Sequence, residues 1–514
     1  NNVRFGVNAG NSIQSGGNYN TVVGDEAGTA ITTGDSNVAV GYASLDANTT
    51  GGSNTAVGSA ALGANTTGNI NTAVGLSALA TNTEGLNNSA LGVNALNANT
   101  TGDDNVAIGY QALLLNTTAD DNTAVGNAAL KVNTTGTQNN AFGSGALDAN
   151  TTASFNTAMG HNALGANTTG AGNTALGQTA LTANTTGAQN VGIGAGAGGA
   201  VTTAVNSTFV GYVSGGATTT GATNTGLGWS AFASNTTGAE NVAVGGQALA
   251  ANTTASNNTA IGRSALVANT TGADNTAVGK SALAANTTAA NNSAFGATSL
   301  DANTTGTQNN AFGTNALTAN TTASYNAAFG TSSLAANTTG ASNSAFGANT
   351  LAANTTASNN TAMGYNAGTA ITTGTENTVV GALAGDAITT GNENTAVGKT
   401  ALSADTQGHR SVAIGQGTLA TQNFTSSTNS YNTAVGFQAG NAVTTGTLNT
   451  FIGALSGDAV TTGGQNTALG QNSLGSNTTA SNNTAIGYVA LVANTTGASN
   501  VAVGASSLDA NTEG

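Results

Sequence analysis

The amino-acid sequence predicts an all-β protein, a parallel β-solenoid built as one array of about 30 coils. A 17-residue unit, read NTAVGLSALATNTEGLN at 71–87, recurs along the chain, and its fifth residue is a glycine that appears 30 times between Gly6 and Gly504. Repeat positions are numbered here from Asn71, so that Gly75 is position 5. Of the 29 intervals between these glycines, 27 are 17 residues long. A unit this short suits one solenoid coil of two short strands joined by two tight turns.

Length and composition favour one elongated domain over residues 1–514. No proline, charge run or shift in composition divides the 514 residues; the interval from Gly6 to Gly24 has one extra residue, and one coil, at 416–436, is enlarged. This coil should bulge as a loop without shifting the strand ladder. Because the chain begins and ends inside the repeat, we expect it to be an excerpt of a longer fibre.

The charge balance limits the classes of partner. Six basic residues stand against 20 acidic ones, giving a net charge of −14, and no basic stripe could neutralise phosphates. We therefore expect no nucleic-acid partner. The absence of cysteine excludes disulfides and thiolate metal sites. No apolar run approaches the roughly 18 residues of a membrane-spanning helix, so direct membrane insertion is not expected.

The first half of the repeat predicts a strand with two distinct faces. Position 4 is apolar in all 30 copies, which is typical of a core position, and position 2 shares its face because strand side chains alternate. Position 3 points the other way and is nearly always alanine, with exceptions such as Arg4, Val22, Phe209 and Phe451. A small apolar residue repeated so often suggests a flat face approached closely by identical chains. The predicted core residues are Val57, Val74, Leu91 and Ile108, and the predicted subunit interface is Ala56, Ala73, Ala90, Ala107 and Ala124.

The second half of the repeat contains an exchange between two positions. Position 9 is leucine in 21 copies, phenylalanine in one and glycine in eight. Where it is glycine, position 12 is isoleucine or valine in seven of eight copies, and otherwise position 12 is almost always asparagine. Close packing lets only one large side chain fill one interior space. We infer that positions 9 and 12 share a slot, and that Leu62 and Leu79 belong to the core.

The chain carries little material for catalysis, and we expect neither an enzyme nor a cofactor. His161 and His409 lie about 14 or 15 coils apart and cannot meet within one chain. The acid pair Asp103 and Asp104 lacks the further oxygen ligands that calcium needs and is interpreted as solvated turn residues. No metal site is predicted.

Two surface features suggest binding. Position 6 carries several aromatic residues, and Tyr212 and Trp229 occupy neighbouring coils, where they could stack on sugar rings of a host-surface glycan. Threonines at positions 13 and 14 form two files, of which only one can face water because adjacent strand residues point to opposite faces. A threonine file can bind ice, although it can equally stabilise turns and ladders.

The repeat resembles a known family. Ser411, Val412, Ala413, Ile414 and Gly415 spell the SVAIG motif of trimeric autotransporter adhesin heads, and the fuller NTAVGxxALxxNTTG pattern looks like repeats of bacterial and phage tail-fibre proteins. The resemblance implies a left-handed parallel β-roll, three chains around a threefold axis, and an extracellular location on a cell surface or virion. In that family the small residue beside the Val and Ile faces the partner chains.

We therefore predict a structural, adhesive fibre or tail-fibre shaft, a stiff homotrimeric spacer with a multivalent surface that binds a host glycan or protein. Two alternatives stay open. One is a monomeric β-solenoid that binds ice or another surface, and the other is a filament or sheath subunit that stacks end to end.

Overall fold

The chain repeats one kind of coil, which consists of a three-residue strand followed by a series of turns. The computed structural model describes residues 1–513, and the chain divides into two compact units, Asn1–Asn257 and Asn258–Gly514. No helix occurs among residues 1–513. The strands of the first unit are β1 (Val3–Phe5), β2 (Thr21–Val23), β3 (Val38–Val40), β4 (Thr55–Val57), β5 (Thr72–Val74), β6 (Ser89–Leu91), β7 (Val106–Ile108), β8 (Thr123–Val125), β9 (Asn140–Phe142), β10 (Thr157–Met159), β11 (Thr174–Leu176), β12 (Val191–Ile193), β13 (Thr208–Val210), β14 (Thr225–Leu227) and β15 (Val242–Val244). Those of the second unit are β16 (Thr259–Ile261), β17 (Thr276–Val278), β18 (Ser293–Phe295), β19 (Asn310–Phe312), β20 (Ala327–Phe329), β21 (Ser344–Phe346), β22 (Thr361–Met363), β23 (Thr378–Val380), β24 (Thr395–Val397), β25 (Gly408–His409), β26 (Val412–Ile414), β27 (Thr428–Asn429), β28 (Thr433–Val435), β29 (Thr450–Ile452), β30 (Thr467–Leu469), β31 (Thr484–Ile486) and β32 (Val501–Val503).

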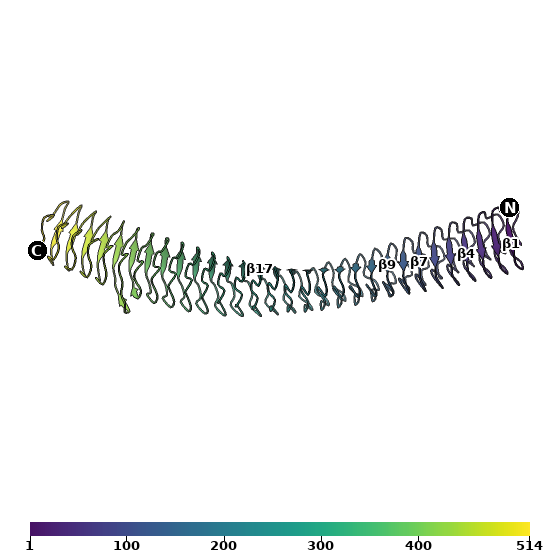
Figure 1. Ribbon diagram of the computed structural model, residues 1–514, viewed down its shortest axis with the longest axis horizontal. Coiled ribbons are helices and arrows are strands. Elements are labelled where there is room, and N and C mark those ends of the chain that lie inside the picture. Colours follow the sequence, from purple (N-terminus) through teal and green to yellow (C-terminus); the bar gives the residue numbers. More distant parts are fainter. Residues whose placement is uncertain (514) are drawn as a thin grey trace. The chain divides into compact units, whose positions relative to one another are not determined.

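Within each unit the strands pair in parallel and in register. In β4 and β5, for example, Thr55 pairs with Thr72 and Val57 with Val74, so each strand lies beside the strand one 17-residue coil away. Figure 1 shows this succession of coils along each unit, with the strands aligned on one side. The predicted parallel β-solenoid with a 17-residue coil is confirmed.

The second half of the coil contains turns where we expected a second strand. Ser77 and Leu79 have φ angles of 53° and 51°, which an extended strand does not allow. The N–H of Ala78 donates to the carbonyl of Gly75 at 3.3 Å, closing a turn. Bonds between coils persist, since Leu62 N–H donates to Ala78 O at 3.0 Å. The coil therefore has one strand, and its turns stack on those of the next coil.

The two faces of the strand are the reverse of those predicted. The alanines at position 3, predicted as a subunit interface, are buried inside the coil: Ala56, Ala73, Ala90, Ala107 and Ala124. The position-4 residues, predicted as core, lie on the outside and are half-buried to exposed: Val57, Val74, Leu91 and Ile108. Leu62 and Leu79 are fully buried as predicted. The alternation itself was predicted correctly, but alternation does not say which face is inside.

The reason for this reversal is the limited space opposite position 3. At Gly192, which stands at position 3, an added Cβ would lie 2.9 Å from Cγ of Leu181, the position-9 leucine of the coil before. Position 9 thus fills the interior, so that position 3 of a leucine coil is alanine or glycine, and at Gly192 even a methyl group would be too close. In several coils with glycine at position 9 a larger residue enters from position 3 instead, and an added Cβ at Gly457 would lie 2.5 Å from Cε1 of Phe451. Positions 3, 9 and 12 therefore share the slot that was inferred for positions 9 and 12 alone.

Backbone conformation explains why glycine is the alternative to leucine at position 9. Leu62 and Leu79 both have φ of 51°, a left-handed conformation that costs a residue with a Cβ roughly 1 kcal/mol or more. Gly28 adopts φ of 54° without that cost. A leucine at position 9 offsets the backbone cost by burying its side chain, which contributes about 1.5–3 kcal/mol.

Two files of buried asparagine line the opposite side of the interior. At position 12, Asn65 donates through Nδ2 to Asn48 Oδ1 at 2.8 Å and to the Gly68 carbonyl at 3.0 Å. At position 1, Asn54 Nδ2 donates to the same Gly68 carbonyl at 2.9 Å, while its own N–H donates to Asn37 Oδ1 at 3.0 Å. These asparagines form polar ladders that join one coil to the next.

The shared slot predicts how a glycine coil can be converted. Gly368→Leu alone should destabilise its coil by about 1–3 kcal/mol, because an added Cβ would already lie 2.9 Å from Ile371 Cδ1. Adding Ile371→Asn together with Val379→Ala should restore stability to within about 1 kcal/mol, since this recreates the Leu/Asn combination with a small residue at position 3 of the next coil. The new asparagine can also donate to Asn354 Oδ1, which has no hydrogen-bond partner among the described residues.

Hydrogen exchange of residues 361–377 in increasing urea would measure both effects. A single variant as stable as the wild type would contradict the shared slot.

Candidate interaction surface

Within each unit, the outward face of the strands carries a row of apolar residues at position 4 beside a row at position 2 that is mainly threonine. Position 4 is apolar in every coil, and its side chains are half-buried to exposed, with 36% of Val57 and 49% of Leu91 accessible. In β18–β21 this row consists of four phenylalanines whose successive ring centroids lie 4.6, 4.7 and 4.9 Å apart, with the rings nearly parallel. Stacked rings offer their edges outward, because each flat face is covered by the next ring. We name this surface, positions 2 and 4 of the coils, the strand face.

Charges of opposite sign lie on either side of the strand face. Position 17, two residues before each strand, carries six exposed acids: Asp104, Asp121, Glu240, Asp274, Glu376 and Glu393. Position 6, two residues after each strand, carries three exposed bases: Arg263, Lys280 and Lys399. Arg410 at position 17 and Asp25 at position 6 are the exceptions. Both edges are mainly neutral, and the charged residues that they carry are mostly acidic at position 17 and mostly basic at position 6.

The aromatic pair at position 6 is well exposed. Tyr212 and Trp229 follow strands β13 and β14 in neighbouring coils, with 60% and 55% of their surfaces accessible. Their contact with sugar rings stays a prediction.

The two threonine files differ in their partners. At position 13 the hydroxyl of Thr66 donates to the carbonyl of Thr83 in the next coil at 2.9 Å, and this bond recurs along the chain. At position 14, Thr67 is exposed. The position-13 file therefore stabilises the ladder, and position 14 is the file that faces water.

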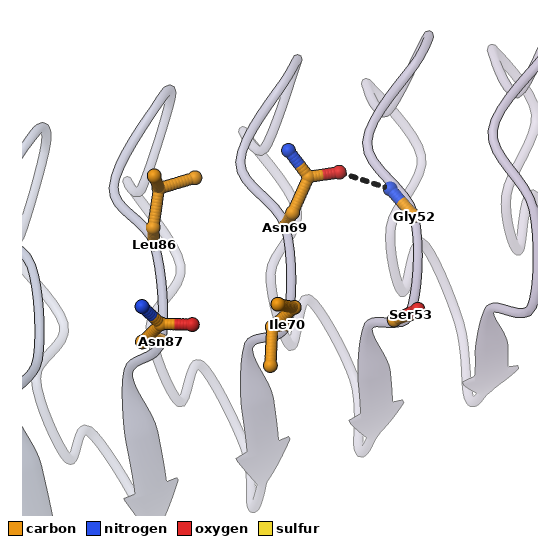
Figure 2. Close-up of a pocket in the computed structure, with 6 residues that line it drawn as sticks. All are labelled: Gly52, Ser53, Asn69, Ile70, Leu86 and Asn87. Atoms are coloured by element: carbon orange, nitrogen blue, oxygen red, sulfur yellow. Dashed lines mark hydrogen bonds between the residues drawn. The ribbon is translucent and has the colours of Figure 1, made fainter.

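The first acid of each Asp pair stands at position 16, where its side chain accepts a hydrogen bond from a backbone N–H. Asp103 Oδ1 accepts the N–H of Leu86 at 2.7 Å, and Asp120 Oδ1 accepts the N–H of Asp103 at 2.8 Å. Figure 2 shows the same bond from Asn69 Oδ1 to the N–H of Gly52, beside a shallow depression of about 430 Å³ that Ile70 and Leu86 help to line. These side chains accept hydrogen bonds from backbone N–H groups that have no backbone acceptor in the neighbouring coils. Among residues 1–513, no group of acids or histidines is placed to hold a metal ion.

The enlarged coil leaves the main ladder undisturbed, as predicted. Strand β26 pairs directly with β28 across it, Val412 opposite Thr433. The extra residues form an excursion in which β27 pairs with β25, and Phe424 is almost fully buried as its anchor.

A buried carboxylate replaces an asparagine of the ladder in the coil before the enlarged one. Asp405, at position 12, accepts the N–H groups of Gly408 and Phe424 at 3.0 and 3.1 Å. Gln422 Nε2 donates to its other oxygen at 2.7 Å, and Gln422 Oε1 accepts from Asn432 at 2.9 Å. Burial raises the pKa of Asp405, and these hydrogen bonds oppose the rise only in part.

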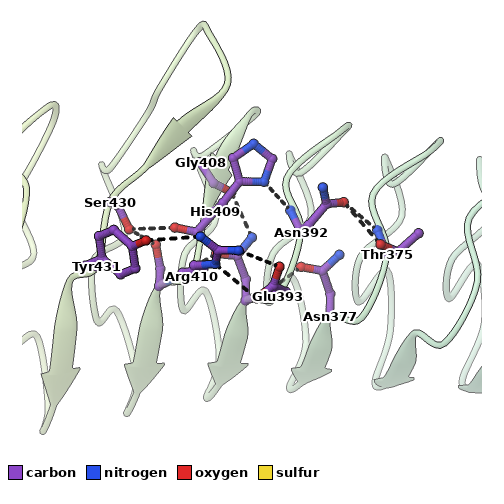
Figure 3. A network of polar contacts seen from close by, with 11 residues as sticks. Thr375, Asn377, Asn392, Glu393, Gly408, His409, Arg410, Ser430 and Tyr431 are labelled. Atoms are coloured by element: carbon purple, nitrogen blue, oxygen red, sulfur yellow. Dashed lines mark hydrogen bonds and ion pairs between the residues drawn. The ribbon is translucent and has the colours of Figure 1, made fainter.

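A second polar network covers the outside of the same coil. Arg410 donates to both carboxylate oxygens of Glu393, at 3.0 and 3.2 Å, and to the Tyr431 hydroxyl at 3.0 Å (Figure 3). The hydrogen bond from Arg410 lowers the pKa of Glu393. His409 belongs to this network, whereas His161 stands exposed at position 6.

The raised pKa of Asp405 predicts a pH-dependent difference between the wild type and Asp405→Asn. A carboxyl group with a higher pKa in the folded chain stabilises the fold while it is protonated. This contribution is complete below the unfolded value of about 3.9 and is lost as the pH rises through the folded value. The wild type should therefore gain stability relative to Asp405→Asn as the pH falls through this range, measured by denaturant midpoints at each pH. A difference that does not change with pH would contradict the assignment.

Comparison with known proteins does not assign the chain to a family. No protein-family model matches the chain, and no curated protein matches it either. No helix in the described part of the chain is long and apolar enough to cross a membrane. The adhesin resemblance accordingly remains a prediction carried by the repeat itself.

Proposed function

We propose that the chain forms the shaft of a structural, adhesive fibre, assembled from three copies that pack through the strand face. One observation carries this proposal: position 4, apolar in all 30 copies, lies on the outside of the coil. Exposed apolar patches beyond a few hundred Å² are rare on monomeric soluble proteins and mark interaction sites. An identical chain presents an identical row at the same spacing and can cover the whole face.

The charged residues at the two edges support a ring of chains. In a ring, each chain meets its neighbour through two different edges, whereas a twofold contact places the same patch on both sides. The acidic residues at position 17 and the basic residues at position 6 attract one another in the first arrangement. The proposed number of chains, three, and the proposed location, extracellular or on a virion, come from the resemblance of the repeat to trimeric adhesin heads and tail-fibre proteins.

The proposed role is mechanical, with no catalytic step or cofactor. Repeated weak contacts along a shaft add avidity without one tight site. Exposed aromatic residues such as Tyr212 and Trp229 are our candidates for contact with a host glycan or protein.

The mass in solution tests the proposal. Light scattering should give about three times the chain mass of 48.8 kDa. Phe346→Lys places a charge in the strand face and should dissociate the assembly or weaken it by at least about 2 kcal/mol. Thr356→Lys, at exposed position 14 of the same coil, is the matched control and should leave the mass unchanged. A wild-type mass of one chain would reject the assembly.

Disulfide trapping tests the ring, because the natural chain has no cysteine. Gln308 at position 17 and Thr314 at position 6 lie on opposite sides of β19, with five residues between them at roughly 3.3 Å each. This spacing exceeds the roughly 7 Å that a disulfide spans between Cα atoms. The double variant Gln308→Cys/Thr314→Cys should therefore give covalent trimers on a non-reducing gel.

Each single cysteine variant should stay uncross-linked. Covalent dimers of Thr314→Cys alone would show a twofold contact and contradict the ring.

A further inference from the structure

His409 occupies a place where other coils use a side chain to accept a backbone N–H. It stands at position 16, and its Nδ1 accepts the N–H of Asn392 at 2.8 Å (Figure 3). In the coil before, Asn392 Oδ1 does the same for the N–H of Thr375 at 2.7 Å. Elsewhere a serine serves, as where Ser154 Oγ accepts from Thr137 N–H at 3.0 Å.

The bond from Asn392 fixes the proton on the imidazole. A backbone N–H can only donate, so Nδ1 must present a lone pair and the ring proton must sit on Nε2. Nε2 lies 2.8 Å from Ser427 Oγ and donates to it. The neutral ring thus joins the coil before it to the tip of the excursion.

The backbone of His409 also holds the excursion. His409 pairs with Asn429 in the small β25–β27 sheet, and its carbonyl accepts from the N–H and the hydroxyl of Ser430, at 3.0 and 3.1 Å. A displacement of His409 therefore moves the whole base of the excursion.

Protonation of the ring removes one of these connections. An imidazolium carries hydrogen on both nitrogens, so its Nδ1–H would face the N–H of Asn392 without an acceptor between them. The titratable groups nearby are Glu393 in the coil before, Arg410 next in the chain, Tyr431 in the coil after and buried Asp405. Glu393 already accepts both hydrogen bonds from Arg410, so its charge is largely engaged.

We propose that His409 is an acid-sensitive latch, which ties the base of the excursion to the coil of Asn392 and releases this tie when Nδ1 takes up a proton, while the Nε2–H bond to Ser427 is kept. The tip around Ser426 and Ser427 is already exposed, so protonation changes the attachment of the base of the excursion and not the exposure of its tip. This inference does not depend on the proposed assembly, because every contact lies within one chain.

Hydrogen exchange of the full chain tests the latch. We would compare the peptide covering residues 390–410 at about pH 8 and about pH 5, with rates corrected for the intrinsic pH dependence of exchange. The wild type should lose about tenfold in protection on acidification, the change expected for one lost hydrogen bond. His409→Ala should be poorly protected at both values.

The matched variant is His409→Asn, which keeps an acceptor that does not titrate, as Asn392 does in the coil before. It should stay protected at both pH values. Loss of protection in His409→Asn equal to that of the wild type would place the titration elsewhere, at Asp405 or Glu393, and would overturn the proposal. Full protection of His409→Ala would overturn it as well.

Discussion

The structure depends on one constraint, the volume inside a coil. Successive coils lie about 4.8 Å apart, and one coil can enclose roughly one large side chain beside its asparagines. That side chain comes from position 9 in most coils, even though leucine must adopt a left-handed backbone there, as Leu79 does. Position 3 then receives only alanine or glycine. With the interior filled in this way, the apolar residue at position 4 has no place inside and must lie on the surface.

The period predicted the coil, the parallel register and the undisturbed ladder at the enlarged coil, because each follows from spacing alone. The inward face could not be read from alternation, which is the same whichever side is buried. A signal was nevertheless present. Val22, Phe209, Val379 and Phe451, the large apolar residues at position 3, all occur in coils with glycine at position 9. This exchange places positions 3 and 9 in one space, and it outweighs the impression that a row of alanines lies at an interface.

The asparagine ladders and the strand face have different consequences. Buried amides bonded to the coils before and after stabilise only an aligned stack, since a slip would leave their donors and acceptors unpaired in the interior. Asn184 and Asn354 show what an interrupted ladder leaves unpaired. One coil after Asn184, position 12 is Val201, and one coil after Asn354 it is Ile371. The Oδ1 atoms of both asparagines lack a hydrogen-bond partner among the described residues. Polar ladders thus fix the register inside one chain. The apolar side chains of the strand face do not fix the register in this way. A partner that covers them would stabilise the chain.

The enlarged coil and the coil before it depart from the repeat in several ways at once. Asp405 and Gln422 replace the ladder asparagines, His409 replaces a side chain that does not titrate, and an additional two-stranded sheet appears beside the main ladder. Burial of the Asp405 carboxylate opposes its ionisation, so the coil before the enlarged one is held by a group whose protonation changes its stability. An Asn ladder responds little to pH, because an amide has no proton to gain in this range. The interior of the chain beside the enlarged coil therefore responds to acid where the asparagine ladder of the other coils does not.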